Sequence, residues 1–105
     1  MTETKHTKTI IVTRHPGAIE FIRDAGYEGE VIEHFAPEMV EDGMIVVGVL
    51  PIHLIGEILE KGGRYVHVVM PQIPQEMRGQ ELAPEQMREY GATLMEVVDL
   101  GFAEV

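Results

Sequence analysis

The sequence predicts an α/β protein: a small sandwich in which a mainly parallel sheet of four or five strands packs against about three helices. Apolar runs rich in β-branched residues alternate along the chain with amphipathic stretches, which is the order of β–α–β units. Glycine and proline stand at the junctions between these segments. The 105 residues suffice for one domain, which we expect over residues 8–105 after a flexible leader of residues 1–7.

Four segments are expected to be strands, and a fifth is ambiguous. The segment 44–50 is almost continuously apolar, as in a strand buried on both faces of a sheet. Residues 93–100 could extend the helix before them or form an edge strand, and Val97 and Val98 favour the strand. The four expected strands are residues 8–13, 30–35, 44–50 and 64–70.

Three amphipathic segments predict the helices that cover this sheet. They span residues 18–25, 51 to about 61, and about 84 to 92. The first helix stops at Gly26, and its expected inner face consists of Ala18, Ile19, Ile22 and Ala25. Pro51 suits the first turn of the second helix. The spacing of strand, helix and strand over residues 44–70 matches a right-handed crossover between parallel strands.

The charge of the chain excludes some partners. It has 8 Lys and Arg against 18 Asp and Glu, which gives a formal net charge of −10. Such a body repels polymeric nucleic acid and anionic membranes, because both are bound through clustered basic residues. A small anion remains possible, because a local pocket of arginine, histidine and backbone N–H groups can override the global field.

The residue types and their spacing narrow the chemistry further. No cysteine is present, so thiolate catalysis and disulfides are excluded, and a reducing cytoplasm is the expected location. The five histidines do not stand at metal-ligand spacings, and we expect neither a metal nor another cofactor. The longest apolar stretch, residues 44–55, is interrupted and too short to span a bilayer.

A candidate site follows from the predicted order of strands. Ligands of open parallel sheets bind beyond the carboxyl ends of the strands, and three segments reach that edge here. Each carries polar residues or glycine, so we expect an anion pocket. The candidate residues are Thr13, Arg14, His15, Pro16 and Gly17 after the first strand, Gly48, Leu50, Pro51 and His53 around the end of the third, and Arg78 and Gly79 in the loop after the fourth.

Several of these residues have a chemical reason to serve such a pocket. Arg14 carries a fork of donors suited to phosphate, and it precedes a helix N-terminus, where anions bind readily. His15 could donate a proton or a hydrogen bond near neutral pH. His53 is expected to be neutral, because the helix dipole disfavours a cation in a first turn. Gly48 suggests a close approach of backbone or ligand, and Arg78 could close over a bound anion.

The same residues have plainer interpretations. Arg14 could pair with a nearby carboxylate, while His15 merely caps the helix. His53 could be a surface histidine, and Arg78 a solvated loop residue. His67 falls in the middle of a strand, where a core or sheet-face position is expected.

Five segments that lie in order over most of residues 10–94 match one protein family. These are residues 12–19 (VTRHPGAI), 42–54 (DGMIVVGVLPIHL), 63–67 (GRYVH), 78–82 (RGQEL) and 87–94 (MREYGATL). On these segments the chain resembles the small CRISPR-associated Csx-sixteen family, which is encoded beside type III CRISPR systems. The resemblance implies a Rossmann-like fold related to the sensors of cyclic oligoadenylate.

The resemblance also implies an activity. It indicates a ring nuclease that cleaves a cyclic oligoadenylate, above all cyclic tetra-adenylate, and so switches off the antiviral response. Without a metal, the ribose 2′-OH can be the nucleophile, which yields a 2′,3′-cyclic phosphate. Arg14 and the turn at residues 16–18 would then stabilise charge, and His15 or His53 would act as general base or acid. A two-fold symmetric ring suits a homodimer with the ligand across its interface.

Other classes of function remain open on the sequence. A binding-only sensor would use the same pocket without turnover. A histidine phosphatase would carry a strand–Arg–His–Gly loop, but Pro16 separates His15 from Gly17 here. A structural partner subunit would not need the pocket at all.

Overall fold

The computed structural model describes residues 8–70, 74–77 and 79–105 of the chain. Its strands are β1 (Thr9–Val12), β2 (Glu30–Ile32), β3 (Ile45–Gly48), β4 (Arg64–Val69) and β5 (Thr93–Val97). Its α-helices are α1 (Pro16–Asp24), α2 (Ile52–Glu60) and α3 (Pro84–Glu89), and two short 3₁₀ turns, η1 (Pro37–Met39) and η2 (Gln75–Met77), lie between them. The predicted leader, residues 1–7, lies outside the described residues.

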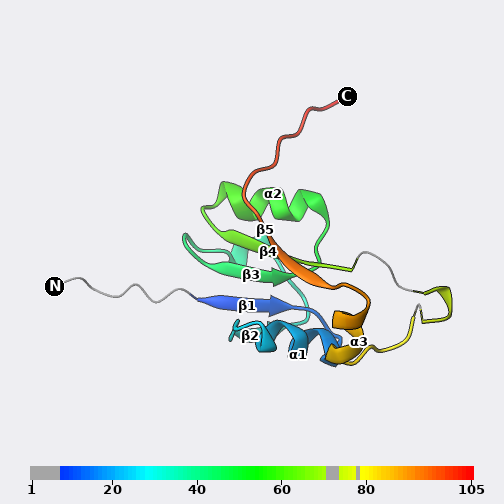
Figure 1. The fold of residues 1–105 in the computed structure, drawn as a ribbon. Coiled ribbons are helices and arrows are strands. Elements are labelled where there is room, and N and C mark those ends of the chain that lie inside the picture. Colours follow the sequence, from blue (N-terminus) through cyan, green and yellow to red (C-terminus); the bar gives the residue numbers. More distant parts are fainter. Residues whose placement is uncertain (1–7, 71–73, 78) are drawn as a thin grey trace.

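The strands form one sheet in the order β2-β1-β3-β4-β5 (Figure 1). The first four are mutually parallel, and β5 runs antiparallel to β4. This confirms the prediction of a small α/β sandwich with a mainly parallel sheet and about three helices. The ambiguous segment after α3 is the edge strand β5, in which Val97 pairs with Tyr65.

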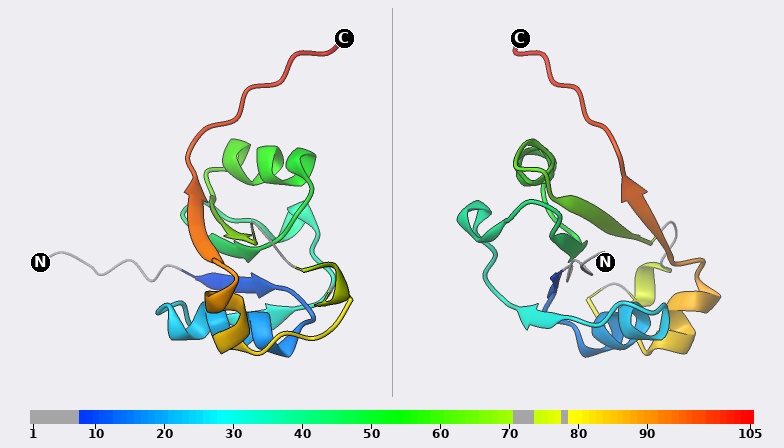
Figure 2. Two further views of the ribbon diagram at one scale, coloured as in Figure 1. Left: turned by 45° about the vertical axis from the view of Figure 1, so that its right-hand side comes forward. Right: turned by 90° about the vertical axis from the view of Figure 1, so that its left-hand side faces the viewer.

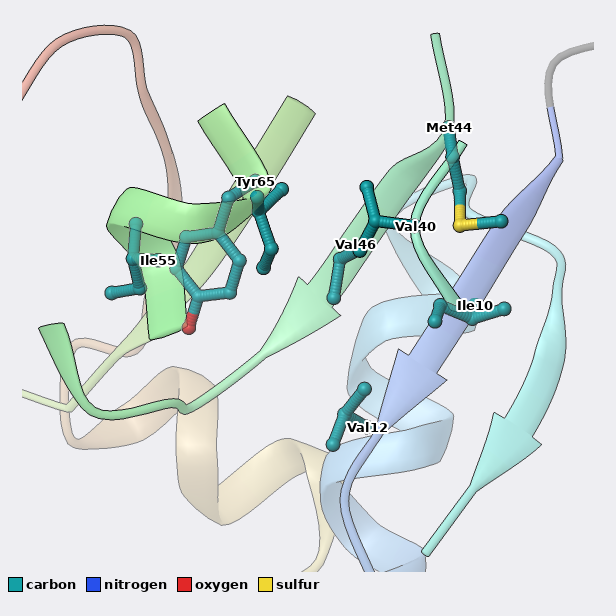
Figure 3. Packing of buried hydrophobic residues seen from close by; sticks show 8 residues of the cluster. Ile10, Val12, Val40, Met44, Val46, Ile55 and Tyr65 are labelled. Atoms are coloured by element: carbon teal, nitrogen blue, oxygen red, sulfur yellow. The ribbon is translucent and has the colours of Figure 1, made fainter. Parts of the chain in front are cut away.

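Helices cover both faces of the sheet (Figures 1 and 2). The core under α1 and α3 consists of Ile11, Phe21, Ile22, Val47, Val66, Val68 and Met87. The core under α2 and η1 consists of Ile10, Val12, Val40, Met44, Val46, Ile55, Ile58 and Tyr65 (Figure 3). No helix in the described ranges is both long enough and apolar enough to cross a membrane.

The two cores explain the apolar runs of the central strands. Side chains of a strand alternate between the faces of a sheet, so Ile10 and Val12 pack under α2 while Ile11 packs under α1. The same alternation places Val46 and Val47 in opposite cores. A strand covered on both faces needs apolar residues at successive positions, which is why residues 10–12 and 45–47 read as continuous apolar runs.

Two helices differ from their predicted bounds. α1 begins earlier, at Pro16, whose φ suits the first helical position, and Phe21 instead of Ala25 completes its buried face. α3 ends earlier, at Glu89. Gly91 follows with a φ of 87°, which is in the left-handed region and stops the helix.

Candidate functional site

Strands β1 and β3 are neighbours in the middle of the sheet. After β1 the chain continues to one face of the sheet, and after β3 it continues to the other face. β1 leads through α1 to β2, and β3 leads through α2 to β4. Because α1 and α2 pack on different faces, the two loops separate at the carboxyl ends of the strands. Such a topological switch point leaves a crevice, which is where open α/β sheets bind ligands.

A cavity of about 720 Å³ opens at this switch point. Its volume falls within the range of about 300–1,000 Å³ that is typical of small-molecule sites. Four stretches of chain line most of it, namely residues 12–15 at the end of β1, 33–35 after β2, 48–50 at the end of β3 and 79–82 before α3. Helix and strand residues complete the lining, namely Ala18, Leu54, Val68, Met70 and Met87.

Arg14 supplies the positive charge among the described lining residues. Its side chain is exposed, and no carboxylate of residues 8–70, 74–77 or 79–105 forms an ion pair with it. The interpretation that Arg14 is a partner for a nearby carboxylate therefore has no support in this part of the chain. The five N–H donors of the guanidinium remain available for an anionic ligand.

His15 stands at the N-cap position of α1, yet its ring makes no capping hydrogen bond. The ring Nδ1 lies 3.4 Å from Oε2 of Glu81, and both side chains are open to solvent, 71% and 64% exposed. The backbone N–H of His15 donates to Oγ1 of Thr13 at 3.2 Å, which shapes the turn out of β1. A carboxylate at Nδ1 favours the tautomer whose Nε2 can accept a proton.

The first turn of α1 borders the cavity through Ala18. No side chain caps this turn, so its free N–H groups add partial positive charge beside Arg14. Gly17 is buried, and the carbonyl oxygen of Leu82 occupies the space in which its Cβ would lie. Gly17 therefore serves the packing of the segment before α3 on α1, and it does not line the cavity.

Gly48 ends β3 at the other side of the crevice. A Cβ on Gly48 would overlap the carbonyl oxygen of Val12 in the neighbouring strand. Of the two close approaches that the sequence left open, backbone or ligand, the structure shows the backbone contact. Gly48 nevertheless lines the cavity together with Val49 and Leu50.

The structure brings about half of the predicted site residues together. Those that line the cavity are Thr13, Arg14, His15, Gly48, Leu50 and Gly79. Pro16, Gly17, Pro51 and His53 are not among the lining residues. His53 is exposed in the first turn of α2, and Arg78 lies outside the described residues.

The cavity also contains residues that sequence reasoning did not assign. Glu33 and His34 line it because β2 ends at Ile32 and does not reach residue 35. The position directly after a parallel strand was a usable signal for both. Glu81 had no such signal, because a loop position alone does not say which strand end it will meet. No group of three His, Cys, Asp or Glu side chains within the described residues could hold a metal ion.

The comparison with protein families now adds an identity. A family model described as "Putative CRISPR-associated protein (Cas_VVA1548)" matches residues 10–99, which run from the second residue of β1 past the end of β5. No curated protein and no solved structure matches the chain. Since the match covers most of the 105 residues, the chain belongs to the CRISPR-associated Cas_VVA1548 family.

Proposed function

We propose that this protein is a metal-independent ring nuclease of the Csx-sixteen type. It would open a cyclic oligoadenylate second messenger, above all cyclic tetra-adenylate, and switch off type III CRISPR signalling in the cytoplasm. The observation that carries the proposal is the cavity at the β1–β3 switch point, with Arg14 and His15 in its lining. The membership in a CRISPR-associated family supports the same biological setting.

The lining chemistry suits a nucleotide. Phe35, Leu54 and Met87 contribute apolar surface to the lining, as a purine ring requires. Arg14 and the uncapped first turn of α1 supply donors for a phosphate. An anion can bind there although the chain carries a net charge of −10, because these donors act at close range.

The proposed reaction transfers a phosphoryl group within the ring. The 2′-oxygen of one ribose attacks the adjacent phosphorus, the bond from phosphorus to the 5′-oxygen breaks, and a 2′,3′-cyclic phosphate forms. A base takes the proton of the 2′-hydroxyl, and an acid gives one to the leaving 5′-oxygen. We assign the base to Nε2 of His15, oriented through Nδ1 by Glu81, and charge stabilisation to Arg14. His34, the other imidazole in the lining, is the candidate acid.

The size and symmetry of the ligand favour two copies of the chain. A ring of four nucleotides has two-fold symmetry, and it exceeds a cavity whose volume suits one small molecule. Two cavities that face each other in a homodimer would each hold one half of the ring. The expected assembly is therefore a two-fold dimer that closes around its substrate.

The direct test mixes the purified protein, in EDTA, with cyclic tri-, tetra- and hexa-adenylate, and resolves the products by chromatography with mass detection. We expect linear fragments that end in a 2′,3′-cyclic phosphate from cyclic tetra-adenylate. Intact rings in all three mixtures would refute a metal-independent nuclease. The same samples, run without EDTA and with added Mg²⁺ or Mn²⁺, identify a metal-dependent enzyme.

A binding-only sensor is the second candidate, and one observation favours it. His15 and Glu81 are largely exposed, and their 3.4 Å contact is long for a pair that must be held rigid for catalysis. A sensor would retain intact cyclic tetra-adenylate in a stable complex. Isothermal titration with the ring, followed by mass analysis of the recovered ligand, separates the two candidates.

A further inference from the structure

Tyr65 is completely buried under α2 (Figure 3). Its hydroxyl nevertheless contacts three polar groups. It accepts a hydrogen bond from the N–H of Leu50 and donates one to the carbonyl oxygen of Gly48, each at 2.9 Å. The third contact is Nδ1 of His67, at 2.8 Å. Gly48 and Leu50 line the cavity, whereas Tyr65 and His67 do not. The hydrogen bonds of Tyr65 thus reach the site through the backbone at the end of β3.

Only one arrangement of protons satisfies all three contacts. A hydroxyl has one proton to donate and two lone pairs to accept with. The carbonyl of Gly48 can only accept and the N–H of Leu50 can only donate, so Nδ1 of His67 must donate as well. The neutral ring of His67 then has no proton on Nε2. Protonation of Nε2 leaves the donor at Nδ1 in place, so the network persists when His67 becomes charged.

The hydroxyl is also stable in its protonated form. Burial raises the pKa of Tyr65 from 10.0 to about 12. Without the hydroxyl, the carbonyl of Gly48 and the N–H of Leu50 would lose this partner beside an apolar core. Buried polar groups without partners are unfavourable, so the loop would turn toward the solvent of the cavity.

We propose that Tyr65 is a positioning residue for the cavity: its hydroxyl, oriented by Nδ1–H of His67, holds Gly48 and Leu50 and thereby sets the shape of the β3–α2 loop that a ligand meets. The inference deepens the proposed function and rests on it for the identity of the ligand. The loop itself can be tested without any ligand.

The first arm of the test uses NMR on the ligand-free protein. Tyr65→Phe should speed the hydrogen exchange of the Leu50 amide roughly tenfold, because one hydrogen bond is lost. Tyr27→Phe is the matched control, since Tyr27 packs partly buried under α1 and no hydrogen bond of its hydroxyl is found among the described residues. In the wild type, ¹⁵N shifts of His67 should show a proton on Nδ1. Should Tyr65→Phe not fold, His67→Ala removes the donor and keeps the hydroxyl for the same exchange measurement.

The second arm uses cyclic tetra-adenylate as the probe. Tyr65→Phe should raise its KM, or its Kd if it is only bound, roughly tenfold, with a smaller change in kcat, while Tyr27→Phe leaves both unchanged. If the Leu50 amide exchanges at the same rate in Tyr65→Phe and in the wild type, the hydroxyl does not hold the loop. If neutral His67 carries no proton on Nδ1, the proposed hydrogen-bond arrangement is wrong. A faster-exchanging loop with unchanged KM would overturn the positioning role. If the wild type neither binds nor cleaves the ring, the proposed function fails. The exchange rate of the Leu50 amide and the ¹⁵N shifts of His67 still test whether Tyr65 holds the loop.

Discussion

The carbonyl oxygen of Leu82 lies where a side chain on Gly17 would begin. This contact joins the first turn of α1 to the segment before α3, although the two are far apart in the sequence. The same segment carries Glu81, which reaches Nδ1 of His15. The close packing at Gly17 thus lies next to the contact between this carboxylate and the imidazole of His15.

Gly17→Ala should destabilise the protein by about 1–3 kcal/mol, because the added methyl group meets a backbone carbonyl that cannot rotate away. The better helix propensity of alanine offsets up to about 1 kcal/mol of this. Urea denaturation measures the free energy of unfolding. Gly101→Ala is the control, since no atom lies near its Cβ position and its change should stay within about 0.5 kcal/mol. Equal stabilities of the two variants would contradict the packing role of Gly17.

Arg14→Ala should weaken binding of cyclic tetra-adenylate by roughly 10- to 100-fold, the range for a lost charge-assisted hydrogen bond. Titration calorimetry at two salt concentrations measures the effect, and the loss should be larger at low salt. Arg23→Ala removes the same charge from an exposed position in the last turn of α1, outside the cavity lining, and should bind like the wild type. Identical affinities of Arg14→Ala and the wild type would remove Arg14 from the site.

His15→Gln should lower the single-turnover rate by about 10²–10⁴-fold, since it removes the proposed base. Glu81→Gln keeps the size of the side chain but not its charge, and it should cost about tenfold through poorer orientation of His15. Quenched-flow sampling of the linear product measures both rates. The variant His53→Gln tests which of the two histidines predicted from the sequence, His15 or His53, is the base. If His53→Gln loses the activity and His15→Gln keeps it, the base is His53 and the assignment made from the cavity is wrong.

Tyr65 should make the protein sensitive to alkali. Its pKa is raised to about 12 in the folded protein, against 10.0 for an ordinary tyrosine. Between these values the unfolded chain releases the proton of this tyrosine and the folded chain keeps it. The contribution of Tyr65 to the free energy of unfolding is therefore fully present below pH 10 and falls as the pH rises toward 12. From about pH 9 to about pH 11.5 the loss attributable to Tyr65 is about 2 kcal/mol.

Urea denaturation of the wild type and Tyr65→Phe at both pH values isolates this contribution, because the other titrating groups are common to both chains. The stability difference between them should shrink by about 2 kcal/mol at the higher pH. A difference that does not change with pH would mean that Tyr65 titrates normally in the folded protein.

Much of the fold could be predicted from local pattern. The run at residues 44–50 indicated a strand covered on both faces, and β3 is such a strand. Boundaries were less accurate where a single residue decides them. The φ of Gly91 ends α3 early. Ala25 is the exposed C-cap residue of α1, which ends at Asp24, and the buried residue of this helix that the pattern missed is Phe21. Periodicity averages over several residues and does not resolve such points.

Some residues of the candidate site could likewise be predicted from the sequence, and others could not. Thr13, Arg14 and His15 could be predicted because they follow a parallel strand, and every such strand end reaches the same edge of the sheet. His53 was grouped with them by the same rule, but α2 carries it away from the cavity lining. Glu81 could not be found, because its approach to His15 depends on how α3 and its preceding segment pack on α1.

The sequence by itself determined the alternation of strands and helices, the two apolar faces of the central strands and the acidic character of the chain. These follow from side-chain chemistry at neighbouring positions. Only the tertiary structure decided that β1 and β3 lie side by side with their loops on opposite faces, that Glu81 meets His15, and that Tyr65 holds the backbone of Gly48 and Leu50. Those contacts join residues distant in the chain, and they form because buried surfaces and polar groups must find partners across the whole fold.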